Sequence, residues 1–444
     1  MSAVQGIRTA GAAGPRCCRG GAQAHTHAYA RRRRHHAASS WCAPLHEGGA
    51  ARGLRCASIA RPAPDITAFD DDGDDDDVKY LKDEGQRVVV SNSAFQSDLA
   101  ELIRVGETFT ERQSIDEGPK LEDIMRPVEA EMDQQTQALR NVVGERHPLL
   151  LKTADHIFNA GGKRVRPLIA LLVAKATRRL YGFDGIVDEQ IRLAMISEMI
   201  HTASLVHDDV LDDCELRRGK GTVHSLYGTR VAVLAGDFLF AQSSWFLANL
   251  NNLEVIKLIS QVIADFADGE IAQAASLFNT EITVESYLDK SFYKTASLIA
   301  ASCRSAAVFS DCSESEKDAI FQYGCNLGLA FQIVDDVLDF TQTEEDLGKP
   351  PGQDLASGNI TAPTIFAMQR SDRLRHLLAE DRLGGVGMAE EAMALVVEHG
   401  GIEAAKQLAR QHGEKAKRNL EILPLCAERD SLEMMVEYVL QRIS

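Results

Sequence analysis

The chain has 444 residues, 45% of them apolar and 25% charged, a composition typical of a globular protein and not of a disordered or fibrous one. Its 48 Lys and Arg against 65 Asp and Glu leave a formal net charge of −17. That balance argues against a non-specific nucleic-acid binder, which needs excess positive charge to neutralise phosphates. The longest apolar run, residues 168–174, is far shorter than the roughly 18 residues of a membrane span, so no transmembrane segment is expected. Nine scattered cysteines indicate neither a disulfide framework nor a zinc module.

Residues 1–61 differ sharply from the rest of the chain. They contain ten Arg, no Lys, many Ala, Gly and Ser, and Glu47 as their single acidic residue. This composition predicts an organelle transit peptide and fits a nuclear or nucleic-acid patch around residues 31–36 less well. Removing ten positive charges and one negative charge leaves 38 basic and 64 acidic residues, a net charge of −26. The imported protein is therefore expected to be strongly acidic.

Residues 62–120 are predicted to be an acidic linker and N-terminal extension. The Asp-rich run within residues 65–77 lacks the spaced ligands and closing Glu of a calcium loop, so we interpret it as a solvated linker. From residue 121 to residue 444, apolar residues recur at helical spacing and no segment alternates as a strand does. We predict an all-α fold. Because this part exceeds the usual size of a domain, we expect one large helical bundle around a deep central cavity.

Two aspartate clusters, within residues 207–213 and 335–339, each follow an apolar segment. The first and last aspartates of each D-D-x-x-D pattern lie one helical turn apart on the same face, where like charges repel and lose hydration. A divalent cation would remove both penalties, and oxygen-only ligands suit Mg²⁺. One such cluster alone is as easily a solvated helix end, but two copies in the same apolar context favour a metal site. The pattern residues are Asp208, Asp209, Asp212, Asp335, Asp336 and Asp339.

Basic residues accompany both clusters. A turn entering a helix carries three of them, and there backbone N–H groups and the helix dipole also favour phosphate. Screening over roughly 8 Å prevents distant acidic residues from cancelling such local cations. The arrangement predicts a substrate with two phosphate-rich ends, or two such substrates. The candidate anion-binding residues are Lys163, Arg164, Arg166, Arg217, Arg218, Lys220, Lys294 with Thr295, and Lys349.

These segments, together with residues 236–238 and 347–349, resemble the trans-polyprenyl diphosphate synthases over about residues 129–444. Residues 199–205, 240–242, 254–261 and 358–363 resemble the long-chain plastid members of that family. The resemblance implies a helical bundle of the isoprenoid synthase type. It also implies Mg²⁺-dependent, head-to-tail addition of isopentenyl diphosphate to an allylic diphosphate primer, with release of diphosphate at each step. The long product would serve as a quinone side chain.

The resemblance also implies a role for each matching residue. Mg²⁺ would be held by Asp208, Asp212 and Asp335, with support from Asp209, Asp336 and Asp339. The allylic diphosphate would be contacted by Arg217, Lys294 and Lys349, and isopentenyl diphosphate by Lys163, Arg166, His201 and Arg218. Thr295 and Gln332 would turn oxygen dipoles toward the allylic cation. A homodimer, a transient membrane contact for product release, and the chloroplast as destination, with the mitochondrion as alternative, are implied in the same way.

One position departs from the wider family. Asn359 stands where many members have a lysine in a G-K-x-T context, which leaves the phosphate contact at that point open.

Three other functions are alternatives. A terpene cyclase would mix Asn, Ser or Thr with Glu in its second metal site, unlike residues 335–339. A non-catalytic partner subunit should have lost an aspartate motif, and both are intact. A geranylgeranyl or geranyl diphosphate synthase shares every catalytic residue and is the alternative retained.

Overall fold

The computed structural model describes residues 118–140, 142, 147–159, 162–217, 219–342 and 351–443. The predicted transit peptide, and all but the last three residues of the predicted linker, lie outside these ranges. The helices and strands are α2 (Leu121–Met125), η1 (Arg126–Val128), α3 (Glu129–Arg140), α4 (Pro148–Asn159), α5 (Val165–Arg179), α6 (Asp188–Leu211), β1 (Leu216–Arg217), β2 (Lys220–Gly221), α7 (Val223–Tyr227), α8 (Thr229–Ala248), α9 (Leu253–Ala275), α10 (Val284–Ser291), η2 (Phe292–Ala296), α11 (Ser297–Val308), α12 (Glu314–Thr341), α14 (Gln353–Ala356), α15 (Ala362–Met368), α16 (Asp372–Ala379), α17 (Met388–Glu398), α18 (Gly401–Asn419), α19 (Ala427–Leu440) and η3 (Gln441–Ile443).

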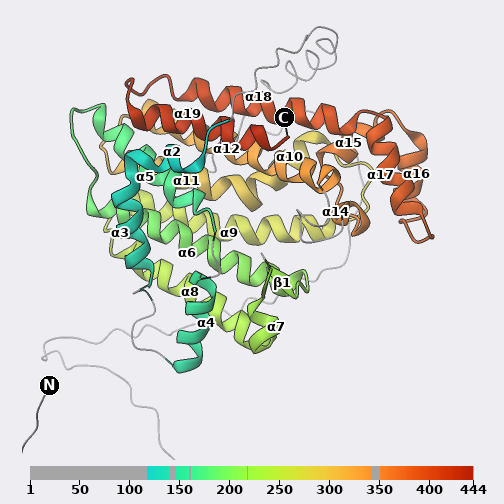
Figure 1. The fold of residues 1–444 in the computed structure, drawn as a ribbon, viewed down its shortest axis with the longest axis horizontal. Coiled ribbons are helices and arrows are strands. Elements are labelled where there is room, and N and C mark those ends of the chain that lie inside the picture. The colour runs from blue at the N-terminus through green and yellow to red at the C-terminus, as the bar shows by residue number, and fades with distance from the viewer. Residues whose placement is uncertain are drawn as a thin grey trace, which may run out of the picture. The chain divides into compact units, whose positions relative to one another are not determined.

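The long helices pack in layers, which confirms the predicted all-α class. In Figure 1, α18 and α19 form the upper edge, α12, α11 and α9 follow below them, and α6 and α8 lie lower still. The contacts agree with this order, since α12 packs on α18 and α11, α11 packs on α5 and α9, and α6 packs on α8. The short antiparallel pair β1–β2 follows the first aspartate cluster. Strand pairing was not expected there, and the turn at Gly219, with φ of 72°, makes it feasible.

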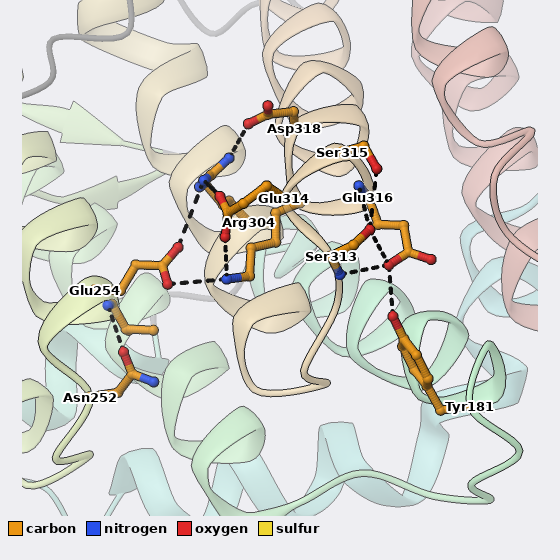
Figure 2. A network of polar contacts seen from close by, with 11 residues as sticks. Tyr181, Asn252, Glu254, Arg304, Ser313, Glu314, Ser315, Glu316 and Asp318 are labelled. Atoms are coloured by element: carbon orange, nitrogen blue, oxygen red, sulfur yellow. Dashed lines mark hydrogen bonds and ion pairs between the residues drawn. The ribbon is translucent and has the colours of Figure 1, made fainter.

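The start of α12 is anchored by a capping box and an ion network. Ser313 accepts a hydrogen bond from the backbone N–H of Glu316, whose side chain accepts one from the Ser313 N–H in return. Figure 2 shows that Arg304 of α11 bridges Glu254 of α9 and acidic residues of α12. Tyr181, just after α5, donates to Glu316 at 2.7 Å. Three helices are thus held together at the end of α12 opposite its aspartates.

Helix α12 packs closely against α11 and the end of η2, and this contact fixes the position of the residues around the second aspartate cluster. A Cβ atom at Gly324 would lie 2.7 Å from the Cα atom of Ala300, and one at Gly328 would lie 2.6 Å from that of Ala296. Glycine is therefore required where the two backbones meet. The preceding turn, η2, is a π-helix, a rare form that often occurs at functional sites. It carries Lys294 and Thr295 toward α12.

One described helix, α8, is long and apolar enough to cross a membrane when judged by length and composition alone. It packs along α6 and buries Ala232, Ala235 and Leu239, although only 33% of its apolar window is buried. Its other face exposes Leu234 and Trp245, which are 57% and 59% exposed. The described chain therefore has no clear membrane-spanning helix, but it does have an apolar surface along α8.

Candidate active site

The first aspartate cluster closes α6, where the helix dipole disfavours negative charge. Asp208 lies in the last turn and Asp212 is the C-cap residue. Burial raises the pKa of Asp208 to about 6, with Lys294 lowering it and Glu270 and Asp212 raising it further. The last turn of α6 contains no basic residue. This end of the helix is therefore an unfavourable place for two carboxylates unless a cation joins them.

Asp209 has a different environment from Asp208. It is buried, and Arg217 of β1 donates to its Oδ1 through Nε at 2.6 Å. Burial raises the pKa of Asp209, while the positive charge of Arg217 opposes that change. Asp209 and Arg217 both line the larger cavity described below. Asp209 therefore forms an ion pair that orients Arg217, and its supporting role toward Mg²⁺ stays a prediction.

The aspartates of the second cluster separate onto different faces of α12. Asp335 faces the larger cavity, where Arg442 Nη1 lies 2.7 Å from its Oδ1. Burial raises the pKa of Asp335, and Arg442 is the strongest of the cations that lower it. Asp339 is buried, and its Oδ2 accepts a hydrogen bond from the backbone N–H of Asp354 at 3.3 Å. In this structure Asp339 helps to hold the chain after α12.

Asp336 is buried between α10 and α12. Tyr287 donates to its Oδ2 at 2.6 Å, and Gln332 donates to its Oδ1 through Nε2 at 2.8 Å. Burial raises the pKa of Asp336 to about 7; Asp354 adds to that rise, whereas the two hydrogen bonds reduce it. Asp336 therefore acts as the acceptor for both hydrogen bonds within a polar cluster.

A cavity of about 540 Å³ brings together most of the residues predicted to bind isopentenyl diphosphate. Arg166 Nη1 and His201 Nε2 lie 2.8 Å apart, and Lys163 Nζ lies 5.2 Å from the centre of the Tyr438 ring. The cavity opens at the N-terminal end of α5, where the helix dipole adds to the attraction for an anion. The predicted site residues that line it are Lys163, Arg166, His201, Asp209, Arg217 and Asp335.

The turn before α5 is set by Arg164. Its φ of 47° is left-handed, a conformation that costs a non-glycine residue about 1–2 kcal/mol. The Arg164 guanidinium bonds to Thr136 of α3, and this contact holds the strained turn in place. Strain of this kind is concentrated at binding sites. It orients the turn so that Lys163 and Arg166 both reach the cavity.

A second, smaller pocket, of about 20 Å³, contains Lys294, one of the three residues predicted to contact the allylic diphosphate, together with Gln332; Arg217 lines the larger cavity instead. Lys294 lies 2.6 Å from Glu270 and donates to Gln273 at 3.2 Å, and Thr295 donates to Gln332 at 2.6 Å. Burial lowers the pKa of Lys294, but the bond to Glu270 and the charges of Asp208 and Asp212 raise it by more. The residues lining this pocket are Gln273, Tyr287, Lys290, Ser291, Lys294, Gln332, Asp336, Asn359 and Thr361.

The described residues contain no group of three or more His, Cys, Asp or Glu side chains placed to hold a metal ion. The predicted ligands are thus not gathered into one set, because Asp335 is paired with Arg442 while Asp208 and Asp212 lie near Lys294 and Glu270. The repulsion between Asp208 and Asp212 nevertheless fits a divalent cation, whose charge would relieve it. Arg218 and Lys349, predicted to bind diphosphate, lie outside the described residues.

Several residues of the two pockets were missed from the sequence. Arg442 and Tyr438 belong to the C-terminal helices, and nothing in their local sequence points to Asp335 or Lys163. Lys290 did carry a signal, since it precedes Lys294 by one helical turn. Glu270, which pairs with Lys294 beside the smaller pocket, had no distinct signal, because Asp265 and Asp268 of the same helix are acidic as well.

Comparison with known proteins agrees with this geometry. The family model described as polyprenyl synthetase matches residues 147–396. Solanesyl diphosphate synthase 1, chloroplastic, of Arabidopsis thaliana and solanesyl-diphosphate synthase 2, chloroplastic, of Oryza sativa subsp. japonica are 57% and 56% identical to this chain. Each match covers 69% of this chain and 75% of the relative.

A solved structure shows the same fold. The polyprenyl synthase from Caulobacter crescentus CB15, complexed with calcium and isoprenyl diphosphate, has a TM-score of 0.67 and 32% identity. The likeness covers 74% of this chain and 100% of that one. The resemblance read from the aspartate motifs and from the plastid-type segments is confirmed. The chain belongs to the polyprenyl synthetase family and is a long-chain trans-prenyltransferase.

Proposed function

We propose that this protein is a solanesyl diphosphate synthase that extends an allylic diphosphate by repeated head-to-tail addition of isopentenyl diphosphate, and that the product becomes a quinone side chain in the chloroplast. The observation that carries the proposal is the position of two anion sites on either side of the end of α6. His201 and Asp209 face the 540 Å³ cavity, whereas Asp208 interacts with Lys294 beside the smaller pocket. Two diphosphates bound in this way would bring their hydrocarbon parts together beside one helix.

In this proposal the larger cavity binds isopentenyl diphosphate. Lys163, Arg166 and His201 supply the positive charge and hydrogen bonds for its diphosphate, with Arg218 as a further expected contact. Arg217 is shared between Asp209 and the cavity, so it would turn toward the allylic diphosphate when that substrate arrives. Lys163 is exposed and Arg166 and Arg217 are half-buried, so their charge-assisted hydrogen bonds would be available to a phosphate that enters the cavity.

The smaller pocket and the end of α6 would bind the allylic diphosphate. Asp208 and Asp212, joined by Asp335 once it leaves Arg442, would hold Mg²⁺, and the bound ion would neutralise the departing diphosphate. Lys294, with Lys349 as a further expected contact, would add charge on the same side. Thr295 donates its hydrogen to Gln332, which leaves hydroxyl lone pairs available to stabilise an allylic cation. No covalent nucleophile is required.

The remaining proposals concern the chain around the site. We propose residues 1–61 as the transit peptide, 62–120 as the linker and extension, and 121–444 as the synthase domain; the family match falls within that domain.

We also propose a homodimer through the exposed apolar face of α8, since a patch of that kind marks an interaction site. Product release would involve a transient membrane contact. Sedimentation of a Trp245→Glu variant should show monomers if α8 forms the dimer interface, and unchanged dimers would exclude α8.

Product analysis tests the activity directly. The full chain and a version lacking residues 1–60 would be incubated with Mg²⁺, radiolabelled isopentenyl diphosphate and geranylgeranyl diphosphate, and the dephosphorylated products separated by chromatography. We expect a product that elutes with authentic solanesol. A product that stops one unit beyond the primer would support the shorter-chain alternative instead, which the relatives do not favour. Wild-type protein that consumes neither substrate would contradict the proposed function.

A further inference from the structure

A buried lysine, Lys290, lies in the smaller pocket with no role assigned so far. It belongs to the last turn of α10, one turn before Lys294, and only 8% of it is exposed. Its side chain lines the pocket together with Lys294 and Gln332. A lysine is almost never this buried unless its charge is compensated, so Lys290 calls for an explanation.

The ammonium group of Lys290 is directed by an amide. Nζ donates to Oδ1 of Asn359 at 2.9 Å. The segment that carries Asn359 is itself held in place, because the Asn359 N–H donates to the carbonyl of Asp354 at 2.9 Å and the Gly358 carbonyl accepts from the Phe278 N–H at 2.8 Å. An ammonium has three N–H donors. The bond to Asn359 uses one of them and orients the other two.

The carboxylates near Lys290 also interact with other groups. Glu270 lies 2.6 Å from Lys294 and serves mainly that lysine. Asp336 accepts hydrogen bonds from Tyr287 and Gln332. Burial lowers the pKa of Lys290, and Lys294 lowers it further, while Asp336, Asp354 and Glu270 oppose the change. Two ammonium groups therefore share one pocket, and the nearby carboxylates of Glu270 and Asp336 are bonded to groups other than Lys290.

We propose that Lys290 is a further binding residue for the diphosphate of the allylic substrate, oriented by Asn359 and acting beside Lys294. The inference rests on the proposed function, because it assigns the smaller pocket to the allylic diphosphate. It also answers the question raised by Asn359, where many family members have a lysine. In this chain Lys290 of α10 brings the positive charge next to position 359, and the side-chain amide of Asn359 orients it. A diphosphate would accept the remaining N–H donors.

The competing explanation is a purely structural one, in which Lys290 only balances Asp336 and Asp354. The test compares the full chain with Lys290→Met, which keeps the length of the side chain but removes its charge. A matched control is Lys406→Met on α18, since Lys406 lines neither pocket and its Nζ lies 3.9 Å from Glu403. Steady-state KM would be measured separately for geranylgeranyl diphosphate and isopentenyl diphosphate. Equilibrium binding of geranylgeranyl S-thiolodiphosphate, which does not react, would be measured in parallel.

We expect Lys290→Met to raise the KM for the primer, and the Kd for its thiolodiphosphate, by at least about tenfold, the usual loss for one hydrogen bond to a charged group. The KM for isopentenyl diphosphate should change little, and Lys406→Met should change neither value. The double variant Lys290→Met/Asn359→Lys should recover most of the primer affinity, since the new lysine at position 359 places an ammonium group in the same pocket. A structural role would not produce this selective rescue.

Three results would overturn the inference. The first is a folded Lys290→Met protein with unchanged primer KM and Kd, and the second is a double variant that regains thermal stability but not primer affinity. Should both variants fail to fold, acetic anhydride labelling of the wild-type chain decides the matter. The thiolodiphosphate must then protect Lys290 better than isopentenyl diphosphate does, and equal labelling is the third overturning result. Failure of the proposed function looks different, because the wild-type chain and Lys406→Met would both be inactive.

Discussion

Replacing Asp208 by asparagine should lower activity and raise stability at the same time. The carboxylate is predicted to hold Mg²⁺ against the departing diphosphate, and removing one such electrostatic contact costs about 10²–10³ in rate. With the metal partly lost as well, we expect turnover to fall by several orders of magnitude. A folded Asp208→Asn protein with near-normal turnover would refute the metal assignment.

The effect on stability follows from the pKa of Asp208, which rises from 3.8 to about 6 on folding. A raised carboxyl pKa means that the folded state binds more protons than the unfolded state between these values, so stability falls as pH rises through that window. At pH 7 the ionised group costs at most about 3 kcal/mol, at 1.36 kcal/mol per pKa unit. Asparagine has no such charge, so without metal the variant should unfold at a higher temperature than the wild-type chain.

Thermal unfolding with and without Mg²⁺ checks both parts of this reasoning. Addition of Mg²⁺ should raise the Tm of the wild-type protein more than that of Asp208→Asn, because the variant has lost a ligand and the repulsion with Asp212. At pH 4 the two metal-free proteins should differ much less than at pH 7. A variant that is less stable than the wild-type chain at pH 7 without metal would show that Asp208 is held by favourable contacts instead.

Three other changes test separate parts of the molecule. A fluorescent fusion to residues 1–65 should enter the plastid, and cytosolic or nuclear fluorescence would show that the arginine-rich segment does not direct import. Ser204→Phe should shorten the product while leaving the first condensation fast, because Ser204 lies one turn before Asp208 on the same face of α6, where the growing chain must pass; chromatography showing a product of unchanged length would contradict that path. Arg442→Gln should raise the KM for isopentenyl diphosphate and cost less than about 1 kcal/mol in chemical denaturation, since Arg442 and Asp335 are 29% and 40% exposed; an unchanged KM would place Arg442 outside the binding site.

The fold class and most of the candidate site could be predicted from the sequence because their signals are local. Helical periodicity depends on near neighbours along the chain, and so does the one-turn spacing of Asp208 and Asp212. The turn before α5 is likewise marked by its own glycines and cations. These features hold however the helices are packed, and the structure places Lys163, Arg166 and His201 around one cavity as the resemblance implied.

The tertiary structure alone decided which side chains meet and how their charges are affected. Asp335 meets Arg442 and Lys290 meets Asn359, and residues so far apart along the chain come together only when helices pack. The same packing separates neighbouring aspartates, because Asp335 faces the larger cavity whereas Asp336 faces the smaller pocket. Burial then raises the pKa of Asp336 to about 7. Sequence spacing cannot predict such a shift, since it depends on the water that surrounding helices exclude.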